Sequence, residues 1–225
     1  MSLHGMLRDS TISRDASFEY MKSKVGQFST PRAQRTRAKM FNATEHILSH
    51  EGYAAWSEEY LCRLCECSRG ALRYQFPDGK YDLFPAFLET VIAQDAKMVE
   101  SLGELSPVER MYLFLLSMRF RPPSPATRAL LEISMAARGD AKLFHLIEPV
   151  IESANARVLG ITTEEPTPEL IALRCILHGA SMYSFQKDFS PEGLHQALGW
   201  ILHSLPVPPA IAARAADMVR ARQNA

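Results

Sequence analysis

The feature that most constrains this chain is the segment from residue 37 to residue 88, in which three short helical patterns precede a longer one. Residues 36–51 carry apolar side chains at the spacing of one helical face, and Gly52 follows as a helix stop. Ser57 and Ser68 each stand where an N-cap would begin a further short helix. Two short helices around a brief turn, packed on a longer helix, predict a helix-turn-helix.

The interior of this predicted head is apolar. The first helix presents Met40, Phe41, Ala43, Thr44, Ile47 and Leu48 on one face, and the second is expected to bury Leu61, Cys62, Leu64 and Cys65. The third helix is expected to run from Arg69 to Phe76 and to end at Pro77.

A longer pattern of residues runs through the whole segment. It comprises Arg37, Met40, Phe41, Ala43, Ile47, Leu48, Gly52, Tyr53, Ala55, Ser57, Leu61, Ser68, Arg69, Gly70, Ala71, Leu72, Phe76, Pro77, Lys80, Asp82, Leu83 and Phe84. This pattern resembles the N-terminal domain of the TetR family of bacterial transcriptional regulators. The segment departs from the family at Glu66, where a glycine is usual, at Arg73, where a tyrosine is usual, and at Gln75, often a histidine. The resemblance implies a helix-turn-helix head followed by a larger helical bundle.

Length and composition fit an all-α protein with a small head and one larger domain. The chain has 225 residues, of which 47% are hydrophobic, and its formal net charge is zero. No apolar stretch reaches the ~18 residues of a membrane span, and no signal-peptide core precedes the head, so we expect a cytoplasmic protein without a membrane partner. We expect a poorly ordered basic arm at residues 1–30, the head at 31–84 and an effector-binding and dimerisation domain at 85–225.

Positive charge is concentrated near the N-terminus. Between Tyr20 and Thr44 the chain has six basic residues and no acid, namely Lys22, Lys24, Arg32, Arg35, Arg37 and Lys39. Such a run is usually a solvated arm, but beside a helix-turn-helix the better interpretation is contact with DNA phosphates.

The remainder of the chain carries the start and stop signals of a series of helices. Ser106-Pro107-Val108-Glu109 is a capping box, and the cap, proline, acid order recurs from Thr167 and from Ser190. Breaks at residues 121–123, 138–140, 160–168 and 206–209 divide the region into about six helical segments, which predicts an all-helical bundle.

Two of these helices carry leucine stripes. Either stripe could face the core of its own subunit, as amphipathic helices commonly do. In the family that the head resembles, however, the last long helices form a four-helix interface between two subunits, and a dimer would place two heads about one DNA turn apart on a palindromic operator. We therefore expect a homodimer whose interface includes Leu170, Leu173, Leu177, Ala180, Leu194, Leu198, Ile201, Leu202 and Leu205.

The residue types in the head suggest roles in DNA binding. Arg69 and Arg73 are expected to enter the major groove, where a guanidinium can bond both O6 and N7 of guanine. Gly70 and Ala71 would let the helix approach the bases closely, and the Ala71 methyl could touch a thymine methyl. The alternative for Arg73 is a salt bridge to a nearby acid such as Glu66. Further expected contacts are Tyr74 to phosphate, Gln75 to a base, and Ser57 and Lys80 to phosphates on either side.

The cysteines of the head allow two interpretations. Cys62, Cys65 and Cys67 form a C-x-x-C-x-C cluster, a pattern that can indicate a metal or thiol sensor. In the resembled family, however, these positions hold small apolar residues, and a free cysteine packs as a small hydrophobe. No fourth ligand lies nearby, because Cys175 belongs to the bundle, so we expect neither a metal site nor a structural disulfide.

By resemblance the bundle should hold a pocket for a small-molecule effector, whose binding would be coupled to operator binding. Each candidate lining residue is of a type that is more often part of an ordinary core. The mixed apolar and aromatic content favours a hydrophobic effector, and His145 is a further candidate polar anchor. The candidate lining residues are Met111, Phe114, Met118, Met135, Phe144, His178, Met182 and Tyr183.

No enzyme motif is found, neither a nucleophile elbow nor a zinc-binding helix, a P-loop or a dinucleotide fingerprint, and no cofactor is expected. The sequence thus favours a DNA-binding regulator, and a repressor because a dimer that covers a promoter blocks polymerase without further contacts. The alternatives are a helical protein-interaction module, or a thiol or metal sensor, whose head no longer binds DNA because Glu58, Glu59 and Glu66 neutralise it.

Overall fold

The computed structural model describes residues 30–162, 167–186 and 188–223, and within them all regular secondary structure is helical. This confirms the all-α class. Of the arm expected at residues 1–30, all but Thr30 lies outside the described residues. The elements are α2 (Pro31–His50), η1 (Tyr53–Ala55), α3 (Glu58–Leu64), α4 (Arg69–Gln75), α5 (Lys80–Glu100), α6 (Pro107–Phe120), α7 (Pro125–Ala137), α8 (Ala141–Arg157), α9 (Pro168–Tyr183), α10 (Pro191–His203) and α11 (Pro209–Gln223).

Five predicted N-caps, all after the first helix, are confirmed. The side chains of Ser57, Ser68, Ser106, Thr167 and Ser190 each accept a hydrogen bond from a backbone N–H of the first helical turn. The capping box is complete, because the Glu109 carboxylate accepts the Ser106 backbone N–H at 2.8 Å. These bonds satisfy N–H groups that have no partner within the helix.

The first helix begins at Pro31 rather than at Thr36. Thr30 caps it by accepting the Ala33 N–H at 3.3 Å, and Pro31 occupies the first turn. It ends as predicted at Gly52, whose φ of 82° lies in the left-handed region and whose N–H donates to the Ile47 carbonyl. The short helix η1 that follows has no counterpart among the predicted elements.

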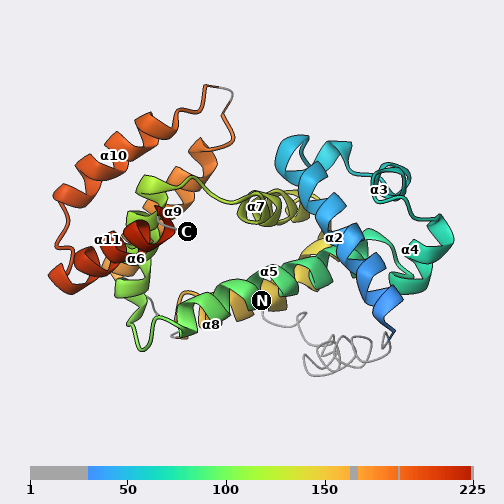
Figure 1. Ribbon diagram of the computed structural model, residues 1–225, viewed down its shortest axis with the longest axis horizontal. Helices are drawn as coiled ribbons and strands as arrows, with labels where there is room; N and C mark the ends of the chain where they lie inside the picture. Colours follow the sequence, from blue (N-terminus) through green and yellow to red (C-terminus); the bar gives the residue numbers. More distant parts are fainter. Residues whose placement is uncertain (1–29, 163–166, 187, 224–225) are drawn as a thin grey trace, which may run out of the picture.

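The buried side chains form two cores rather than one. Buried residues of the head pack with those of α5, α7 and α8, and we call this part the head lobe. A second core joins α6, α9, α10 and α11, which we call the far lobe. Figure 1 shows the two lobes at opposite ends of the molecule, with α5 and α8 side by side in the head lobe. The packing therefore does not divide at residue 84, because the head shares its core with three helices of the expected second domain.

The chain passes between the lobes repeatedly. It leaves the head lobe after α5, returns after α6 and leaves again after α8. The helix α7, inserted by this route, packs along α2, and its Glu132 carboxylate accepts the Tyr53 N–H at 2.9 Å. The head is thus held against α7 by both apolar packing and a hydrogen bond.

The leucine stripes face the core of their own subunit. The predicted interface residues Leu170, Leu173, Ala180, Leu194, Leu198 and Leu202 are buried in the far lobe, and Leu177 and Leu205 pack against it. Ile201 is half-buried. The six buried side chains are thus covered by their own subunit, because periodicity locates an apolar face without identifying what covers it. Contact of the half-buried Leu177, Ile201 and Leu205 with a second subunit stays a prediction.

No helix in the described ranges combines the length and the apolar character that crossing a bilayer requires.

Candidate nucleic-acid interface

The candidate recognition helix is α4, at the end of the head farthest from the far lobe (Figure 1). The Ser68 hydroxyl accepts the Ala71 N–H at 3.1 Å and fixes the start of the helix. The inner face holds Leu72, which is fully buried. The outer face presents Arg69, Gly70, Arg73 and Tyr74, all exposed, with Ala71 half-buried beside them.

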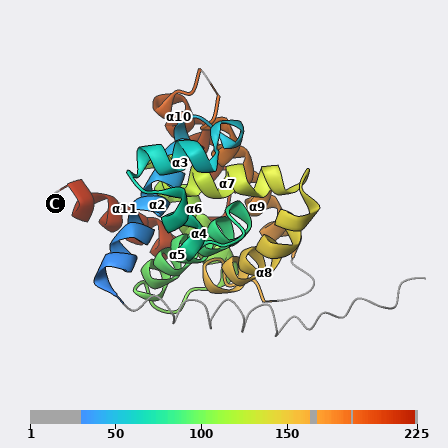
Figure 2. The ribbon, with the colours of Figure 1, turned by 90° about the vertical axis from the view of Figure 1, so that its right-hand side faces the viewer.

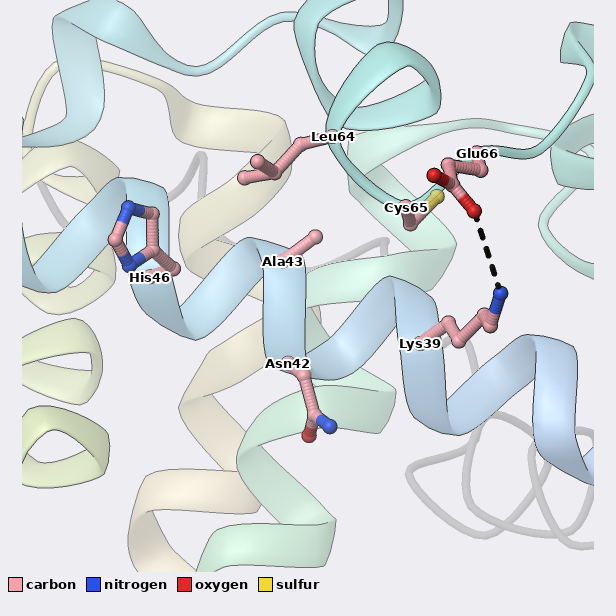
Figure 3. A pocket seen from close by; sticks show the side chains of 7 residues that line it. All are labelled: Lys39, Asn42, Ala43, His46, Leu64, Cys65 and Glu66. Atoms are coloured by element: carbon pink, nitrogen blue, oxygen red, sulfur yellow. Dashed lines mark ion pairs between the residues drawn. The ribbon is translucent and has the colours of Figure 1, made fainter.

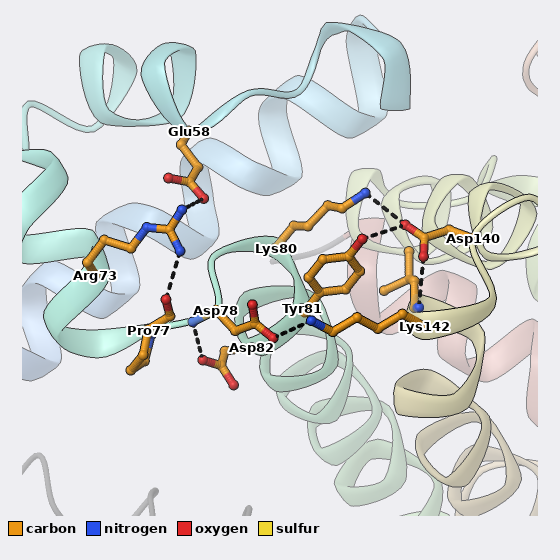
Figure 4. A network of polar contacts seen from close by, with 10 residues as sticks. Glu58, Arg73, Pro77, Asp78, Lys80, Tyr81, Asp82, Asp140 and Lys142 are labelled. Atoms are coloured by element: carbon orange, nitrogen blue, oxygen red, sulfur yellow. Dashed lines mark hydrogen bonds and ion pairs between the residues drawn. The ribbon is translucent and has the colours of Figure 1, made fainter.

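Both arginines of α4 bond acids at the start of α3. Arg69 Nη2 lies 3.0 Å from Glu59 Oε2, and Arg73 Nη2 lies 2.7 Å from Glu58 Oε1. Arg73 also donates from Nη1 to the Pro77 carbonyl at 2.7 Å (Figure 4). The salt bridge considered for Arg73 therefore forms, but with Glu58, while Glu66 lies 3.9 Å from Lys39.

These ion pairs differ in how firmly they hold the two arginines. Exposed pairs contribute about 0–1 kcal/mol, so Arg69 can leave Glu59 for a base at small cost. Arg73 would lose a carboxylate and a carbonyl together. Gly79 lies directly against this arrangement, because its φ is 61° and a Cβ there would collide with the Glu58 carboxylate.

Gln75 is not placed to contact a base. Its side chain is buried, and Nε2 donates to the Ala33 carbonyl of α2 at 3.3 Å. Leu64 also differs from its prediction, since it is 40% exposed rather than buried. Leu64 is the last residue of α3 and lines the cleft beside α2.

Lys80 lies between the head and α8 rather than facing free solvent. Its Nζ donates to Asp140 Oδ2 and to the Tyr53 hydroxyl, each at 2.8 Å. Burial alone would lower the Lys80 pKa, but these two bonds raise it above its ordinary value. A phosphate contact would require Lys80 to give up both partners, so the expected role as a free phosphate contact is not supported. Ser57 is exposed at the start of α3, as a phosphate contact requires.

The network around Lys80 ties the turn after α4 to the start of α8 (Figure 4). The Tyr81 hydroxyl also donates to Asp140 Oδ2, at 3.2 Å. A second ion pair joins Lys142 Nζ of α8 to Asp78 Oδ2 of the turn at 2.7 Å. The same Nζ lies 4.1 Å from the centroid of the Tyr81 ring. Two ion pairs therefore join these segments, one with its lysine at the start of α5 and the other with its lysine at the start of α8.

The early start of α2 adds basic residues to this end of the head. Arg32, Arg35 and Lys39 are exposed on its first turns, and the Gln75 bond to Ala33 brings those turns beside α4. Figure 2 views the molecule from the head side, with α3 and α4 toward the viewer. The run of basic residues without an acid is the sequence signal for these side chains, although it does not single out any one of them as a DNA contact.

Arg37, from the same run, has a packing role. Its guanidinium lies 5.0 Å from the Phe41 ring centroid and 4.8 Å from that of Phe76, and burial lowers its pKa. It holds α2 against the end of α4 rather than facing solvent.

The candidate effector residues do not gather around one cavity. Met111 is fully buried in the far lobe, and Phe114 packs against the core of the head lobe. Met118 and Tyr183 pack at the edge of the far-lobe core. The remaining candidates, Met135, Phe144, His178 and Met182, are exposed, so the structure does not place them as pocket lining.

Two clefts lie elsewhere in the described residues. One, of about 550 Å³, is lined by residues of α5, of α8 and of the turn after α4, and it includes His145, the candidate polar anchor. The other, of about 340 Å³, lies between α2 and the turn before α4. Among the described side chains, no group of three or more histidines, cysteines and acids is arranged to hold a metal ion.

No model of a known protein family matches the chain, and no curated protein matches it in sequence. Among solved structures, a Rhodococcus sp. protein assigned to the TetR family of transcriptional regulators superposes with a TM-score of 0.55 at 18% identity, covering 74% of this chain and 96% of that one. Salmonella enterica GusR gives a TM-score of 0.47 at 15% identity, covering 82% of this chain and 93% of that one. The first of these similarities shows that the two chains share a fold.

Proposed function

We propose that this chain is a TetR-family transcriptional regulator that binds a palindromic operator as a homodimer and represses transcription. The observation that supports this most strongly is the exposed surface of α4, on which Arg69 and Tyr74 stand beside the basic first turns of α2. A specific DNA interface needs a group that reads bases, here Arg69, and groups suited to phosphates, here Tyr74 and the basic residues of α2. The fold shared with the Rhodococcus protein is in accord with this proposal.

The first test is selection of bound duplexes from a random-sequence DNA pool, followed by sequencing. An enriched palindrome would support a dimeric operator-binding regulator. A folded protein that enriches no sequence, and whose weak binding does not fall with salt, would contradict the proposal.

A second test separates base readout from phosphate contact. Arg69→Ala should weaken operator binding by about 1–3 kcal/mol and relax preference at one position. Arg35→Ala should weaken all sequences about equally and reduce the salt dependence by about one counterion. Arg121→Ala, which removes an exposed arginine outside the head, is the charge-matched control. If Arg69→Ala and Arg35→Ala reduced DNA affinity equally and regardless of sequence, the assignment of Arg69 to base readout would be refuted.

We propose that the homodimer forms through the outward faces of α9 and α10. Because the leucine stripes are buried internally, the exposed apolar side chains on these helices are the remaining candidates, and Trp200 is 77% exposed and Ile171 47% exposed. Trp200→Glu should give monomers by sedimentation without loss of helical signal. Leu198→Glu should instead disrupt the far-lobe core. A Trp200→Glu protein that remains dimeric would place the interface elsewhere.

The small-molecule effector remains part of the proposal, and the cleft between α5 and α8 is its best-supported position. That cleft adjoins the ion pairs that join α8 to the turn after α4, so a ligand there would act directly on the orientation of the head. Binding should raise the melting temperature of the protein and change its operator affinity. His145→Ala should weaken both effects; a ligand unaffected by that change binds elsewhere.

One observation favours a second candidate, a helical protein-interaction module. The arginines of α4 are paired with Glu58 and Glu59, which reduces the positive charge available to DNA. If these acids only position the arginines, Glu59→Gln should change operator affinity modestly while sequence preference persists. If they abolish DNA binding, the protein should show affinity for random duplex only after both acids are neutralised.

A further inference from the structure

Three cysteines lie at the end of α3 and in the turn that joins it to α4. Cys62 and Cys65 are buried and Cys67 is half-buried. The Sγ atoms of Cys65 and Cys67 are 3.0 Å apart. The Cys65 thiol also lies 3.9 Å from the Cys62 carbonyl oxygen. The turn therefore holds two sulfurs in direct contact, and Cys62 lies just before it in α3.

The backbone of the turn brings these sulfurs together. Glu66, between the two cysteines, has a φ of 53°, in the left-handed region that side chains other than glycine rarely adopt. The Cys67 N–H donates to the Cys62 carbonyl at 3.0 Å, which closes the end of α3. A disulfide has an S–S bond of about 2.05 Å, so the sulfurs need to approach by roughly 1 Å, a change that small side-chain rotations can supply.

We propose that this turn is an oxidation site, at which Cys65 and Cys67 form a disulfide when the protein meets a peroxide. One thiolate attacks a peroxide oxygen, giving a sulfenic acid and releasing the other oxygen as water once protonated. The second sulfur then attacks the sulfenic sulfur, forming the S–S bond and releasing a second water. Two thiols together lose two electrons and two protons, and hydrogen peroxide is reduced to two waters.

Access to the buried sulfur runs through the cleft between α2 and the turn. Cys65 lines this cleft of about 340 Å³, together with Lys39, His46 and Leu64 (Figure 3). The cleft is large enough for a small peroxide, and it borders Cys65, of which 5% is exposed.

The surroundings of the thiols should make their oxidation slow. Cys67 is one of the two thiols that form the bond, and burial together with hydrogen bonds to its neighbours raises its pKa. Because the thiolate is the reacting form, the rate at neutral pH should be low and should increase with pH. The site therefore suits a response to sustained oxidant.

The position of the turn links oxidation to the recognition helix. Cys67 directly precedes Ser68, the N-cap of α4, and drawing Cys67 toward Cys65 changes the entry of the chain into that helix. Oxidation should therefore weaken operator binding by about tenfold, the equivalent of roughly one base contact. This consequence rests on the proposed DNA-binding function, whereas formation of the disulfide does not.

The test uses the full chain with Cys175→Ser, because Cys175 is exposed and could link two molecules. Exposure to hydrogen peroxide should remove two hydrogen atoms from the intact mass, reversibly by dithiothreitol and faster at higher pH. Peptide mapping should place the bond between residues 65 and 67. Cys65→Ala and Cys67→Ala should each abolish this bond, and Cys62→Ala should leave it.

Several outcomes would overturn the proposal. An unchanged mass in folded protein, irreversible addition of oxygen, or a bond between Cys62 and Cys67 would each contradict the site as assigned. If the bond forms but operator affinity stays the same, the regulatory consequence is wrong. If the reduced protein binds no DNA, the proposed function fails while the mass measurement still decides the oxidation site.

Discussion

Asp140 offers a sharp test of how the head is joined to α8. Its Oδ1 caps α8 by accepting the Leu143 N–H at 3.1 Å, and its Oδ2 accepts bonds from Lys80 and Tyr81. Asparagine is as good an N-cap as aspartate, so Asp140→Asn removes the ion pair and retains the cap, whereas Asp140→Ala removes both.

The expected magnitudes follow from these contacts. A charge-assisted hydrogen bond that is only partly exposed contributes about 1–2 kcal/mol, and loss of an N-cap costs about 1 kcal/mol. The side chains of Lys80 and Asp140 are 29% and 21% exposed, so solvent screens the pair only in part. We expect Asp140→Asn to lower the free energy of unfolding by about 1–2 kcal/mol and Asp140→Ala by about 2–3 kcal/mol.

These free energies can be measured by urea unfolding, with tryptophan fluorescence as the signal from the head lobe. The chain has two tryptophans, and Trp56 packs on Phe84 in the head lobe with ring centroids 4.8 Å apart. In a Trp200→Phe background the signal therefore reports the head lobe, and the midpoint should shift without a change in slope. An Asp140→Asn protein as stable as its parent, beside a destabilised Asp140→Ala protein, would refute the contribution of the ion pair.

The stabilisation by the ion pair of Lys80 and Asp140 should depend on pH in a defined direction. The hydrogen bond from Lys80 lowers the pKa of Asp140 below its ordinary value of 3.8, so its stabilisation is present above that value and is lost as the pH falls through the lowered pKa. The raised pKa of Lys80 means that its contribution is present below 10.5 and is lost as the pH rises through the raised value. The difference between parent and Asp140→Asn should thus be constant from about pH 5 to pH 10 and should shrink in acid.

Three further changes have expected outcomes in the same unfolding assay. Glu66→Gly should stabilise the protein by about 0.5–1 kcal/mol, because relief of the left-handed backbone outweighs loss of an exposed ion pair with Lys39, and a loss of stability would count against the strain. Burial raises the pKa of Asp95, so Asp95→Asn should be more stable than the parent at neutral pH and should lose that advantage in acid, as the parent's carboxyl is protonated. Gly79→Ala should destabilise by about 1–3 kcal/mol through its positive φ and collision with Glu58; a neutral change would mean that the turn relaxes freely.

The sequence predicts those parts of the fold that depend on neighbouring residues. Ser57 and Ser68 start their helices as expected because a cap needs only the backbone N–H of the next turn. Thr30 followed by Pro31 is the same signal as Ser106 followed by Pro107, but it is easily overlooked because the apolar periodicity that marks α2 begins only at Met40. Glu66 stands where the family that the head resembles usually has a glycine, and its φ of 53° is one that glycine adopts without strain.

The partners of polar side chains are beyond prediction because they lie far along the chain. Gln75 bonds a carbonyl 42 positions away and Lys80 a carboxylate 60 positions away, so neither separation leaves a local pattern. For Leu170 and Leu198 the predicted periodicity is right and the side that they face is not, because a buried stripe has the same spacing whether its own subunit or another one covers it.

The route of the chain between the lobes limits where this protein can be divided into fragments or joined to another protein. A fragment that ends after α5 would lack α7 and α8, and would leave the apolar surface of α2 and α5 exposed to water. The head therefore cannot be exchanged between proteins by cutting at one loop. A working chimera would need junctions after α5, after α6 and after α8, so that the head lobe is transferred as two separate pieces of sequence.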